Sequence, residues 1–330
     1  MNRSPPHVSI LIPCFNAEKW LHRAIETALA QTWPIKEVII LDDGSTDRSV
    51  EVARRYANLV RIEQQQNAGQ NVSRNRLTEL SKGDWLVYLD ADDELATDSV
   101  EKKVSFVDTA DAIYGAHEVA IFVGETKTKF SFLPAIQHED SIAAAFEWGY
   151  PNTSAVMFRK SAVHDVGGWN VAIKNCTDYD MYFRLLLRGK RFQAANESWS
   201  LYRQWSPNQA VYQDEQRKAL TRLQVMWSAA EELRVTGALG AFQKQAFQRA
   251  AFGVMRSIAR FDLAKAEAEL LKLIRWDPGF RPRDGSLLYR LAYETCGFRL
   301  AERMATAFHK VNVLGRHQRG VDPQTGMPYV

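Results

Sequence analysis

The chain has 330 residues, 46% of them hydrophobic and 25% charged, which is long enough for a large buried core and too apolar for intrinsic disorder. Its formal net charge of +3 at pH 7 does not indicate a nucleic-acid partner, which would call for a concentrated basic face. Three widely separated cysteines predict neither a disulfide framework nor a cysteine-based zinc site. The N-terminal apolar run is too short for a signal peptide, so we expect a cytoplasmic protein.

Strands and helices alternate from residue 8 to residue 89. Short apolar runs predict strands at residues 8–12, 37–41, 60–63 and 85–89. Apolar residues at helical spacing predict three helices between them: one capped by Asn16, one over residues 50–57 and one over residues 70–81. Alternating elements of these lengths predict an α/β fold, in which helices flank a mostly parallel sheet.

Polar residues follow the carboxyl end of each predicted strand. Asn16 follows the first strand, Asp43 the second and Asn67 the third, and an acidic cluster follows the fourth. Parallel strands place such loops on one rim of the sheet, where open α/β sheets bind their ligands. We therefore expect the four loops to line one crevice.

The acidic cluster consists of Asp90, Asp92 and Asp93, directly after a bulky strand that we expect to be buried on both faces. Residues two apart in an extended chain project to one face, so Asp90 and Asp92 can converge on one point. A hard divalent cation such as Mg²⁺ or Mn²⁺ relieves their repulsion, and such ions commonly join one or two carboxylates to substrate phosphates. An acidic turn in solvent is the weaker alternative.

Two common nucleotide-binding motifs are missing from the sequence. It has neither G-x-G-x-x-G after the first strand nor a G-x-x-x-x-G-K-[ST] loop, which argues against a dinucleotide oxidoreductase and a phosphate-loop NTPase. A nucleotide can still be held through a metal-bridged diphosphate, with Asp43 accepting a hydrogen bond from the N–H of a pyrimidine base. A turn or helix cap beside Gly44 is an equally favoured role for Asp43.

Downstream of the acidic cluster the pattern is less regular. We expect a helix over residues 98–108, extended segments over 112–129, a strand over 152–158 and a tight turn at 167–170. A further helix opens at Thr177, with Asp178 and Asp180 in its first turn. Asp178 can take the proton from an attacking hydroxyl as a general base, with an N-cap as its plain alternative, whereas Asp180 is expected to be structural.

From about residue 212 onward helix-forming residues dominate, so we divide the chain into a domain of residues 1–210 and a C-terminal helical region of residues 211–330. Two apolar stripes are expected there: Leu263, Ala266, Leu270 and Ile274, and then Leu300, Met304, Ala307, Phe308 and Val311. Basic residues flank the second stripe: Arg299, Arg303, Lys310, Arg316 and Arg319. Docking of this last helix onto the protein is favoured, and peripheral contact with anionic lipid at the inner membrane face or homodimerisation are the alternatives.

Four ordered segments carry a resemblance to a known family. VSILIPCFNAEKWLHRAIETALAQTW, EVIILDDGSTDRSVEVA, NAGQNVSRN and YLDADD resemble the nucleotide-sugar-binding half of the family 2 inverting glycosyltransferases, which have a GT-A fold. The resemblance implies a nucleotide-sugar-binding half over residues 1–110 and an acceptor half over residues 111–210. It implies the following roles: nucleotide contacts for Pro13 and Asn16, the base for Asp43, the nucleotide side for Arg74, the donor diphosphate for Asp90 and Asp92, and the metal for Asp92 and Asp93.

The segment GGWNVAIKNCTDYDMYFRLLLRG is similar to the acceptor side of the same family, where a Glu-Asp pair opens the helix. When the residues are matched one by one, the resemblance implies that Asp178 is the catalytic base. Thr177 then stands where an acid is usual in the family. Within residues 200–209 the family often places an arginine and a histidine near the diphosphate. This chain has Arg203, but Trp205 and Ser206 rather than a histidine.

These inferences predict an inverting glycosyltransferase that depends on Mn²⁺ or Mg²⁺. It would move a sugar from a nucleotide-sugar, with a UDP-sugar favoured, to a hydroxyl of a saccharide or lipid-linked acceptor, in the synthesis of a surface polysaccharide or glycoconjugate. A catalytically inactive nucleotide-sugar-binding protein of the same fold is the alternative from another class. A nucleotidyltransferase is a weaker third possibility, because a Gly- and Arg-rich loop is absent after the first strand.

Overall fold

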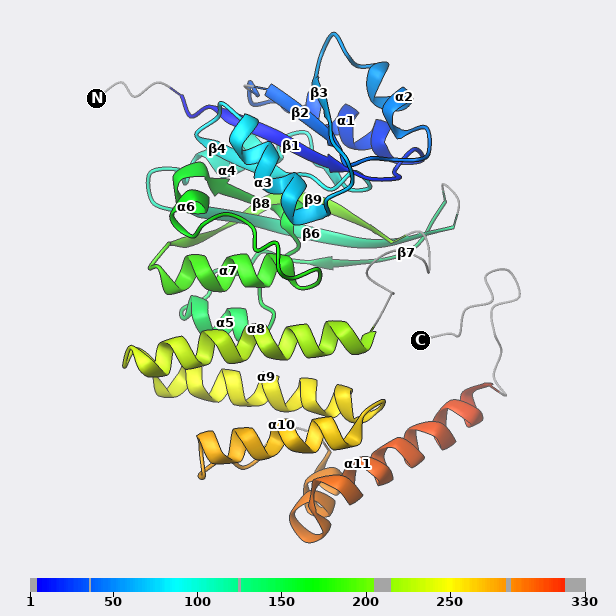
Figure 1. Cartoon of the computed structure of the whole chain (residues 1–330), viewed down its shortest axis with the longest axis vertical. Coiled ribbons are helices and arrows are strands. Elements are labelled where there is room, and N and C mark those ends of the chain that lie inside the picture. The colour runs from blue at the N-terminus through cyan, green and yellow to red at the C-terminus, as the bar shows by residue number, and fades with distance from the viewer. Residues whose placement is uncertain (1–4, 36, 124–125, 205–214, 283–285, 318–330) are drawn as a thin grey trace. The chain divides into compact units, whose positions relative to one another are not determined.

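A computed structural model describes residues 5–35, 37–123, 126–204, 215–282 and 286–317 of the chain (Figure 1). The chain divides into two units, Met1–Val211 and Tyr212–Val330, each with buried apolar residues of its own.

A nine-stranded sheet forms the centre of the first unit, as far as the described residues show. Its strands lie in the order β3-β2-β1-β4-β8-β6-β9-β5, and β7 pairs with β6 outside this path. The strands are β1 (Val8–Cys14), β2 (Glu37–Asp42), β3 (Arg61–Gln64), β4 (Trp85–Tyr88), β5 (Glu94–Leu95), β6 (Ala112–Val123), β7 (Thr126–Leu133), β8 (Val156–Arg159) and β9 (Phe192–Gln204).

The four strands predicted between residues 8 and 89 pair in parallel. Strands β3, β2, β1 and β4 are parallel neighbours, so their carboxyl ends lie on one rim. Strand β8 is antiparallel to β4 and β6, β6 forms an antiparallel hairpin with β7, and only the β6–β9 pair is parallel among the other described pairs. The predicted α/β class is confirmed, and the sheet as a whole is mixed.

Helices cover both faces of this sheet. On one face, Ile10 and Ile12 of β1 share a core with Leu21 and Ile25 of the first helix. On the other face, the hydroxyl of Tyr88 in β4 lies 2.6 Å from that of Thr78 in α3. The helices of this unit are α1 (Leu21–Leu29), α2 (Ser49–Arg54), α3 (Gln70–Leu80), α4 (Ser99–Val104), α5 (Ser141–Phe146), α6 (Lys160–Asp165) and α7 (Thr177–Leu187).

Three local predictions change in the structure. Asn16 does not cap α1: it has a left-handed φ of 49°, and its side-chain oxygen instead accepts a hydrogen bond of 2.8 Å from the backbone N–H of Thr46. The predicted helix over residues 98–108 is regular only over Ser99–Val104. The predicted strand over residues 152–158 begins with a 3₁₀ turn, Thr153–Ala155, before β8.

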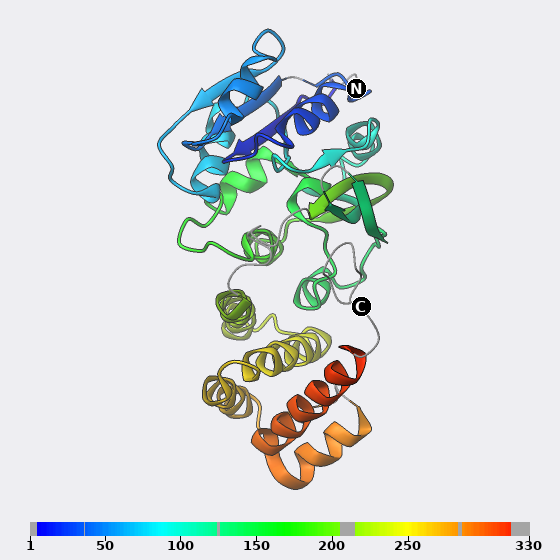
Figure 2. The same cartoon turned by 90° about the vertical axis from the view of Figure 1, so that its right-hand side faces the viewer.

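The second unit is helical in its described residues. Its helices are α8 (Glu215–Val235), α9 (Ala241–Ala259), α10 (Leu263–Trp276) and α11 (Leu287–His317). Helices α8, α9 and α10 lie side by side (Figure 2), and an aromatic cluster joins them, with the ring of Phe247 4.9 Å from Trp227 and 5.2 Å from Trp276. No helix in the described part of the chain is long and apolar enough to cross a membrane.

The described members of the second predicted apolar stripe are exposed rather than buried. Leu300 and Met304 of α11 are 45% and 54% exposed, whereas Phe298 and Glu302 of the same helix are buried. The carboxylate of Glu302 turns inward because Arg256 pairs with it at 2.7 Å and because Tyr289 donates a hydrogen bond to it. Helix α11 is also interrupted at Gly297, where φ is 78°. The side chains of Phe308, Val311, Lys310 and Arg316, as well as Arg319, lie outside the described residues.

Candidate active site

A cavity of about 470 Å³ opens where the parallel strands end. The polar residues that follow the first four strands all line it: Asn16, Asp43, Asn67, Asp90 and Asp92. This convergence is the one predicted from strand order, because parallel neighbours deliver their following loops to one rim. The cavity is therefore the candidate site.

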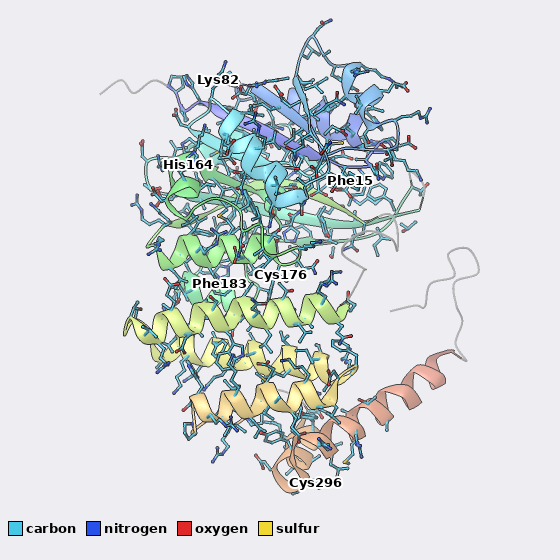
Figure 3. All side chains as sticks on the ribbon, viewed as in Figure 1. Phe15, Lys82, His164, Cys176, Phe183 and Cys296 are labelled. Atoms are coloured by element: carbon cyan, nitrogen blue, oxygen red, sulfur yellow. The ribbon has the colours of Figure 1, made fainter. Side chains whose placement is uncertain are left out.

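The loop after β1 contributes an apolar surface that the sequence analysis did not single out. Phe15 lines the cavity and is 50% exposed. It lies at one end of the parallel strands, and Lys82 lies at the other end (Figure 3). Pro13 lines the cavity beside it. An aromatic ring held open to a polar cavity is suited to contact a planar base. The adjacent Cys14 is not a nucleophile, because burial raises the pKa of its thiol to about 12.

Asp43 is held in place by the loop that follows β3. Its Oδ1 accepts hydrogen bonds from Nε2 of Gln65 at 2.7 Å and from the backbone N–H of Ala68 at 2.9 Å, and its Oδ2 accepts one from the N–H of Gly69 at 2.8 Å. These three bonds leave room for a further donor, since an ionised carboxylate offers about four lone-pair sites. Asp43 is thus a fixed acceptor in the wall of the cavity.

The acidic cluster divides into two kinds of residue. Asp90 and Asp92 line the cavity, whereas the side chain of Asp93 is 0% exposed and is not part of the cavity wall. Oδ2 of Asp93 accepts hydrogen bonds from Ser154 at 2.7 Å and Asn152 at 3.1 Å. Burial, together with the charges of Asp92 and Asp90, raises the pKa of Asp93 well above its usual range. The sequence expectation that Asp93 ligates a metal is therefore revised: Asp93 braces the loop from inside.

Arg203 also braces this loop rather than facing the cavity. Its backbone N–H donates to Oδ1 of Asp93 at 3.1 Å, and its Nε donates to the backbone oxygen of Asp92 at 3.1 Å. The guanidinium pairs with Glu94 and lies between two rings, 4.2 Å from Trp20 and 3.8 Å from Phe122. The resemblance implied a place near the diphosphate for Arg203; in the structure its side chain is buried beside the acidic loop and does not line the cavity. Trp205 and Ser206 lie outside the described residues.

Arg74 lies between the acidic cluster and α7, and it is 2% exposed. Its Nη2 lies 2.8 Å from Oδ1 of Asp90, and its Nη1 donates to the hydroxyl of Thr177 at 3.2 Å. The guanidinium also lies over the ring of Trp169, 4.5 Å from its centroid. Arg74 is not among the residues that line the cavity, and it contacts the cavity wall through Asp90.

Asp178 lies in the first turn of α7 and is not the helix cap. The N-cap is Cys176, which has a left-handed φ of 55°. Oδ1 of Asp178 accepts a hydrogen bond of 2.9 Å from the backbone N–H of Tyr179. Burial raises the pKa of Asp178, the Tyr179 bond and the charge of Arg74 lower it, and the charge of Asp90 raises it. Asp178 thus interacts electrostatically with Asp90 of the acidic cluster.

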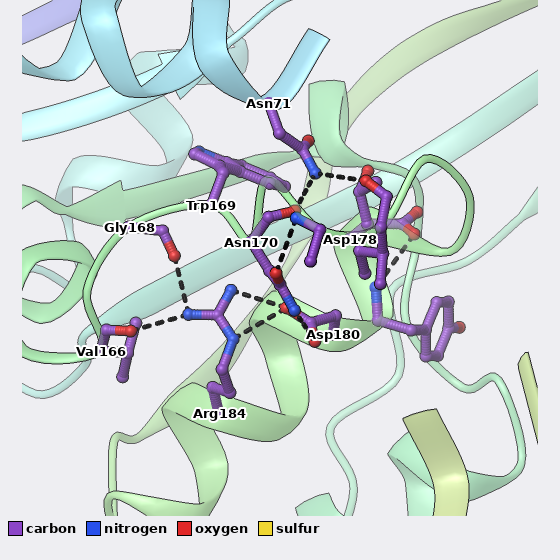
Figure 4. A network of polar contacts seen from close by, with 12 residues as sticks. Asn71, Val166, Gly168, Trp169, Asn170, Asp178, Asp180 and Arg184 are labelled. Atoms are coloured by element: carbon purple, nitrogen blue, oxygen red, sulfur yellow. Dashed lines mark hydrogen bonds and ion pairs between the residues drawn. The ribbon is translucent and has the colours of Figure 1, made fainter. Parts of the chain in front are cut away.

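A network of polar contacts fixes the loop that precedes α7 (Figure 4). Asn71 of α3 donates to the backbone oxygen of Asn170 at 2.7 Å. Asp180 pairs with Arg184 at 2.7 Å, and Arg184 donates to the backbone oxygens of Val166 and Gly168. Asp180 is therefore structural, as expected from its sequence position.

Tyr202 of β9 is a second lining residue that the sequence analysis missed. Burial raises the pKa of its phenol, and four carboxylates raise it further: those of Asp93, Asp92, Asp90 and Asp178. The hydroxyl therefore stays protonated and offers a neutral hydrogen-bond donor in an acidic site. No local motif marks this residue, because it reaches the site from a strand more than a hundred positions along the chain from the acidic cluster.

The acidic loop is compatible with a divalent cation shared with a substrate. Among the described residues, no group of three or more His, Cys, Asp or Glu side chains is placed to hold a metal ion. Mg²⁺ and Mn²⁺ sites in phosphate-transfer proteins use one or two carboxylates, and the substrate supplies other oxygens. Asp90 and Asp92 can supply these one or two carboxylates, because both line the cavity. Asp93 does not line it.

Comparison with known proteins identifies the domain. The family model "Glycosyl transferase family 2" matches residues 9–167, which include the whole acidic loop and most of the cavity wall. Residues 9–167 belong to glycosyl transferase family 2. The family 2 domain thus accounts for the four polar loops, and the resemblance inferred from the sequence is confirmed.

Relatives of this glycosyltransferase domain align over part of their length. The domain is 43% identical over 98 residues to the uncharacterized glycosyltransferase YibD of Escherichia coli K12, which covers 29% of this chain and 28% of that protein. It is 32% identical over 191 residues to the chondroitin synthase of Pasteurella multocida Pm70, covering 56% of this chain and 19% of that protein. The chain therefore spans only a minor part of the length of these relatives.

Solved glycosyltransferase structures share the fold over most of the chain. Staphylococcus aureus TarS 1–349 in complex with UDP-GlcNAc superposes with a TM-score of 0.60 at 14% identity, covering 93% of this chain and 92% of that one. The mannosyltransferase PcManGT of Pyrobaculum calidifontis, in complex with GDP-Man and Mn²⁺, gives a TM-score of 0.52 at 16% identity, covering 93% and 88%. These similarities confirm the predicted GT-A-type fold with added C-terminal helices.

Proposed function

We propose that this protein is an inverting, metal-dependent glycosyltransferase that transfers a sugar from a nucleotide-sugar, preferentially a UDP-sugar, to a hydroxyl of a saccharide or lipid-linked acceptor. One observation carries the proposal: Arg74 contacts both Asp90, in the cavity wall, and Thr177, the residue directly before Asp178, so the proposed base lies close to the proposed donor site. An inverting transfer needs a base on the side of the sugar opposite to the leaving nucleotide.

The donor side of the cavity offers complementary groups for a nucleoside diphosphate. Asp43, fixed by three hydrogen bonds, accepts the N–H of a pyrimidine base, and Phe15 and Pro13 supply apolar contact to its ring. Asn16 lies beside them in the cavity wall. The TarS complexes with UDP-GlcNAc and UDP support a uracil base, and the PcManGT complex with GDP-Man makes guanine the base to test against it.

The acidic loop would hold a divalent cation against the donor diphosphate. Asp92 is the favoured protein ligand, and Asp90 assists it while remaining paired with Arg74. Bound there, Mn²⁺ or Mg²⁺ would neutralise charge that develops on the leaving diphosphate. The PcManGT complex with Mn²⁺ supports this choice of ion. The protonated hydroxyl of Tyr202 supplies a further donor toward the same oxygens.

On the acceptor side, Asp178 takes the proton from the attacking hydroxyl oxygen as that oxygen bonds to the anomeric carbon. The electrons of the bond between sugar and diphosphate leave with the nucleotide, which inverts the configuration. The raised pKa of Asp178 makes it a stronger base than an exposed aspartate once it is ionised. The polysaccharide synthases among the relatives, named for chondroitin and hyaluronan, support a saccharide acceptor and a role in surface polysaccharide synthesis.

A nucleotide-sugar-binding protein without turnover is the second candidate, and one observation favours it. Thr177 replaces the acid that usually precedes the base, so one carboxylate of the family pattern is absent. We place the enzyme first because Asp178 and its electrostatic link to Asp90 are retained. A cytoplasmic location, with peripheral contact at the inner face of a membrane when the acceptor is lipid-linked, belongs to the same proposal, as does a homodimer.

A comparison of binding with turnover tests the proposal. Nucleoside diphosphates with different bases would be titrated into the protein with Mn²⁺ by calorimetry, and sugar release and transfer would be followed by chromatography. Asp178→Asn should keep nucleotide binding and lose at least about 100-fold in turnover, because general-base catalysis supplies about that factor or more. Asp84→Asn, an exposed acid at the opposite rim of the sheet, is the matched control.

Three results would each overturn a part of the proposal. Unchanged turnover in Asp178→Asn would remove the base from the mechanism. A product with retained anomeric configuration would exclude a single inverting displacement. Binding without turnover across varied saccharide and lipid-linked acceptors would favour the binding protein.

A further inference from the structure

Helix α3 presents three polar side chains to the loop that leads into α7. Asn71, Arg74 and Asn75 lie at spacings of three and four residues, which places them on one face of the helix. Asn71 donates to the backbone oxygens of Asn170 and Ile173, at 2.7 and 3.2 Å. These hydrogen bonds connect helix α3 of the nucleotide-binding half to the segment that carries the proposed base.

Asn75 adds two hydrogen bonds between its side-chain amide and the backbone of the same loop. Its Nδ2 donates to the backbone oxygen of Trp169 at 2.8 Å, and its Oδ1 accepts from the N–H of the same residue at 2.7 Å. Trp169 is thereby held with its ring under the guanidinium of Arg74. Arg74 is the one charged residue of the three, and it is almost fully enclosed.

The guanidinium of Arg74 has contacts of two different kinds at its two ends. One end makes an ion pair of 2.8 Å with Asp90, at the cavity wall, and the other donates to the uncharged hydroxyl of Thr177, at 3.2 Å. Thr177 is the first residue of α7 and directly precedes Asp178. Arg74 therefore physically connects the acidic loop to the turn that holds the base.

We propose that Arg74 is a positioning residue: through Asp90 and Thr177 it fixes the proposed base Asp178 relative to the acidic loop, and its charge acts on that base. This inference rests on the proposed function, and it assigns Arg74 a role between the two substrates instead of the nucleotide contact implied by the family resemblance.

The charge balance around Asp178 supports this role. Arginine stays protonated at all relevant pH values, so its charge is permanent. It lowers the pKa of Asp178, against burial and the charge of Asp90, which raise it. Two phenols also interact with Asp178: those of Tyr182 on α7 and Tyr202 on β9, both with raised pKa values and hence neutral.

The threonine at position 177 affects how the charge of Arg74 is shared. In the resembling family an acid usually stands there, and it would place a second carboxylate beside the guanidinium. Thr177 supplies a hydrogen-bond acceptor without a negative charge. Asp90 is then the carboxylate that pairs with Arg74. The positive charge of Arg74 still interacts with Asp178 and favours the ionised form of that proposed base.

Carboxyl-carbon NMR titration tests the coupling without relying on turnover. The Asp178 resonance would be assigned by its loss in Asp178→Asn, and its pKa measured in wild type, Arg74→Lys and Arg74→Gln. Removal of the charge in Arg74→Gln should raise the pKa of Asp178 by about one unit, and Arg74→Lys should raise it less. Arg76→Gln, an exposed arginine on the same helix that pairs with Glu79 at 3.1 Å, is the control and should leave it unchanged.

Kinetics then separates positioning from general structural support. In Arg74→Gln the acidic limb of the pH profile of kcat/KM should move up with the pKa of Asp178, and kcat should fall while KM for the donor changes less than about threefold. Thr177→Val, which keeps the charge but removes the hydroxyl, should lower kcat with little movement of the limb. Melting temperatures and nucleotide binding of each variant serve as the folding control.

Each result decides the inference. An unmoved Asp178 pKa in folded Arg74→Gln would overturn it, as would an equal loss of activity at every pH. If the wild type binds nucleotide but transfers no sugar, the proposed function fails, whereas the NMR titration still shows whether Arg74 acts on Asp178.

Discussion

Replacing Asp93 with asparagine separates a loop brace from a metal ligand. Asp93 is fully enclosed and accepts hydrogen bonds from three donors: the hydroxyl of Ser154 at 2.7 Å, the amide of Asn152 at 3.1 Å and the backbone N–H of Arg203 at 3.1 Å. Asparagine has nearly the same shape, but one acceptor oxygen becomes a donor NH₂ group. In the observed arrangement the new NH₂ group then faces a donor, either the backbone N–H of Arg203 or the amide of Asn152.

The size of the effect follows from this mismatch. A buried polar group left without a partner costs about 1–3 kcal/mol. Part of the loss is offset because the native carboxylate is itself disfavoured by burial, as its raised pKa shows. We expect the free energy of unfolding to fall by about 2 kcal/mol, which for a unit of this size lowers the melting temperature by about 4–8 °C.

Asp92→Asn is the matched comparison, since its side chain lines the cavity and lies one residue away. It should leave the melting temperature nearly unchanged and abolish the Mn²⁺-dependent part of nucleotide binding. Thermal unfolding followed by circular dichroism and calorimetric titration of UDP with and without Mn²⁺ measure the two properties. The reasoning would be refuted if Asp93→Asn were as stable as wild type and lost metal-dependent binding as Asp92→Asn does.

Three further predictions follow from single contacts. Phe15→Ala should weaken nucleotide binding about tenfold without loss of stability, because it removes half-exposed aromatic surface from the cavity wall; unchanged affinity in calorimetry would remove Phe15 from the site. Lys103 is buried, and burial lowers its pKa to about 7, so the folded state binds fewer protons than the unfolded state between that value and the ordinary one of about 10.4. Wild-type stability should therefore rise from pH 7 to pH 10 by up to about 1.4 kcal/mol per pH unit, and urea titrations should show this slope lost in Lys103→Met and kept in Lys102→Met. Gly168→Ala should destabilise the first unit more than Gly167→Ala in thermal melts, since both have positive φ but only at position 168 would the added Cβ lie 2.6 Å from a side-chain oxygen of α3; equal losses would show that backbone strain alone matters.

The sequence by itself determined the order of the elements and the rim on which the site lies. Strand and helix signals are local, because they depend on apolar spacing within a few residues, and parallel pairing then carries Asn16, Asp43 and Asp90 to one edge. The same local logic placed Asp178 in the first turn of a helix.

Only the tertiary structure decided which acid faces the cavity. The two-residue alternation used for Asp90 and Asp92 holds while the chain is extended, and the chain turns immediately after β4, where the N–H of Asp93 donates to the backbone oxygen of Asp90 at 2.9 Å. The turn sends Asp93 inward, to donors that lie 59 to 110 positions away in the sequence.

The surroundings of the two buried arginines, Arg74 and Arg203, were also decided by the tertiary structure and not by the local sequence. A sequence read locally treats Arg74 and Arg203 as polar residues that face solvent or ligand, because an unpaired buried charge is strongly disfavoured. Their carboxylates and aromatic rings come from distant segments, such as Trp169 for Arg74 and Trp20 for Arg203, and these partners exist only once the sheet has formed. Local periodicity fixes where the loops go, and long-range polar pairing fixes which side chains they present.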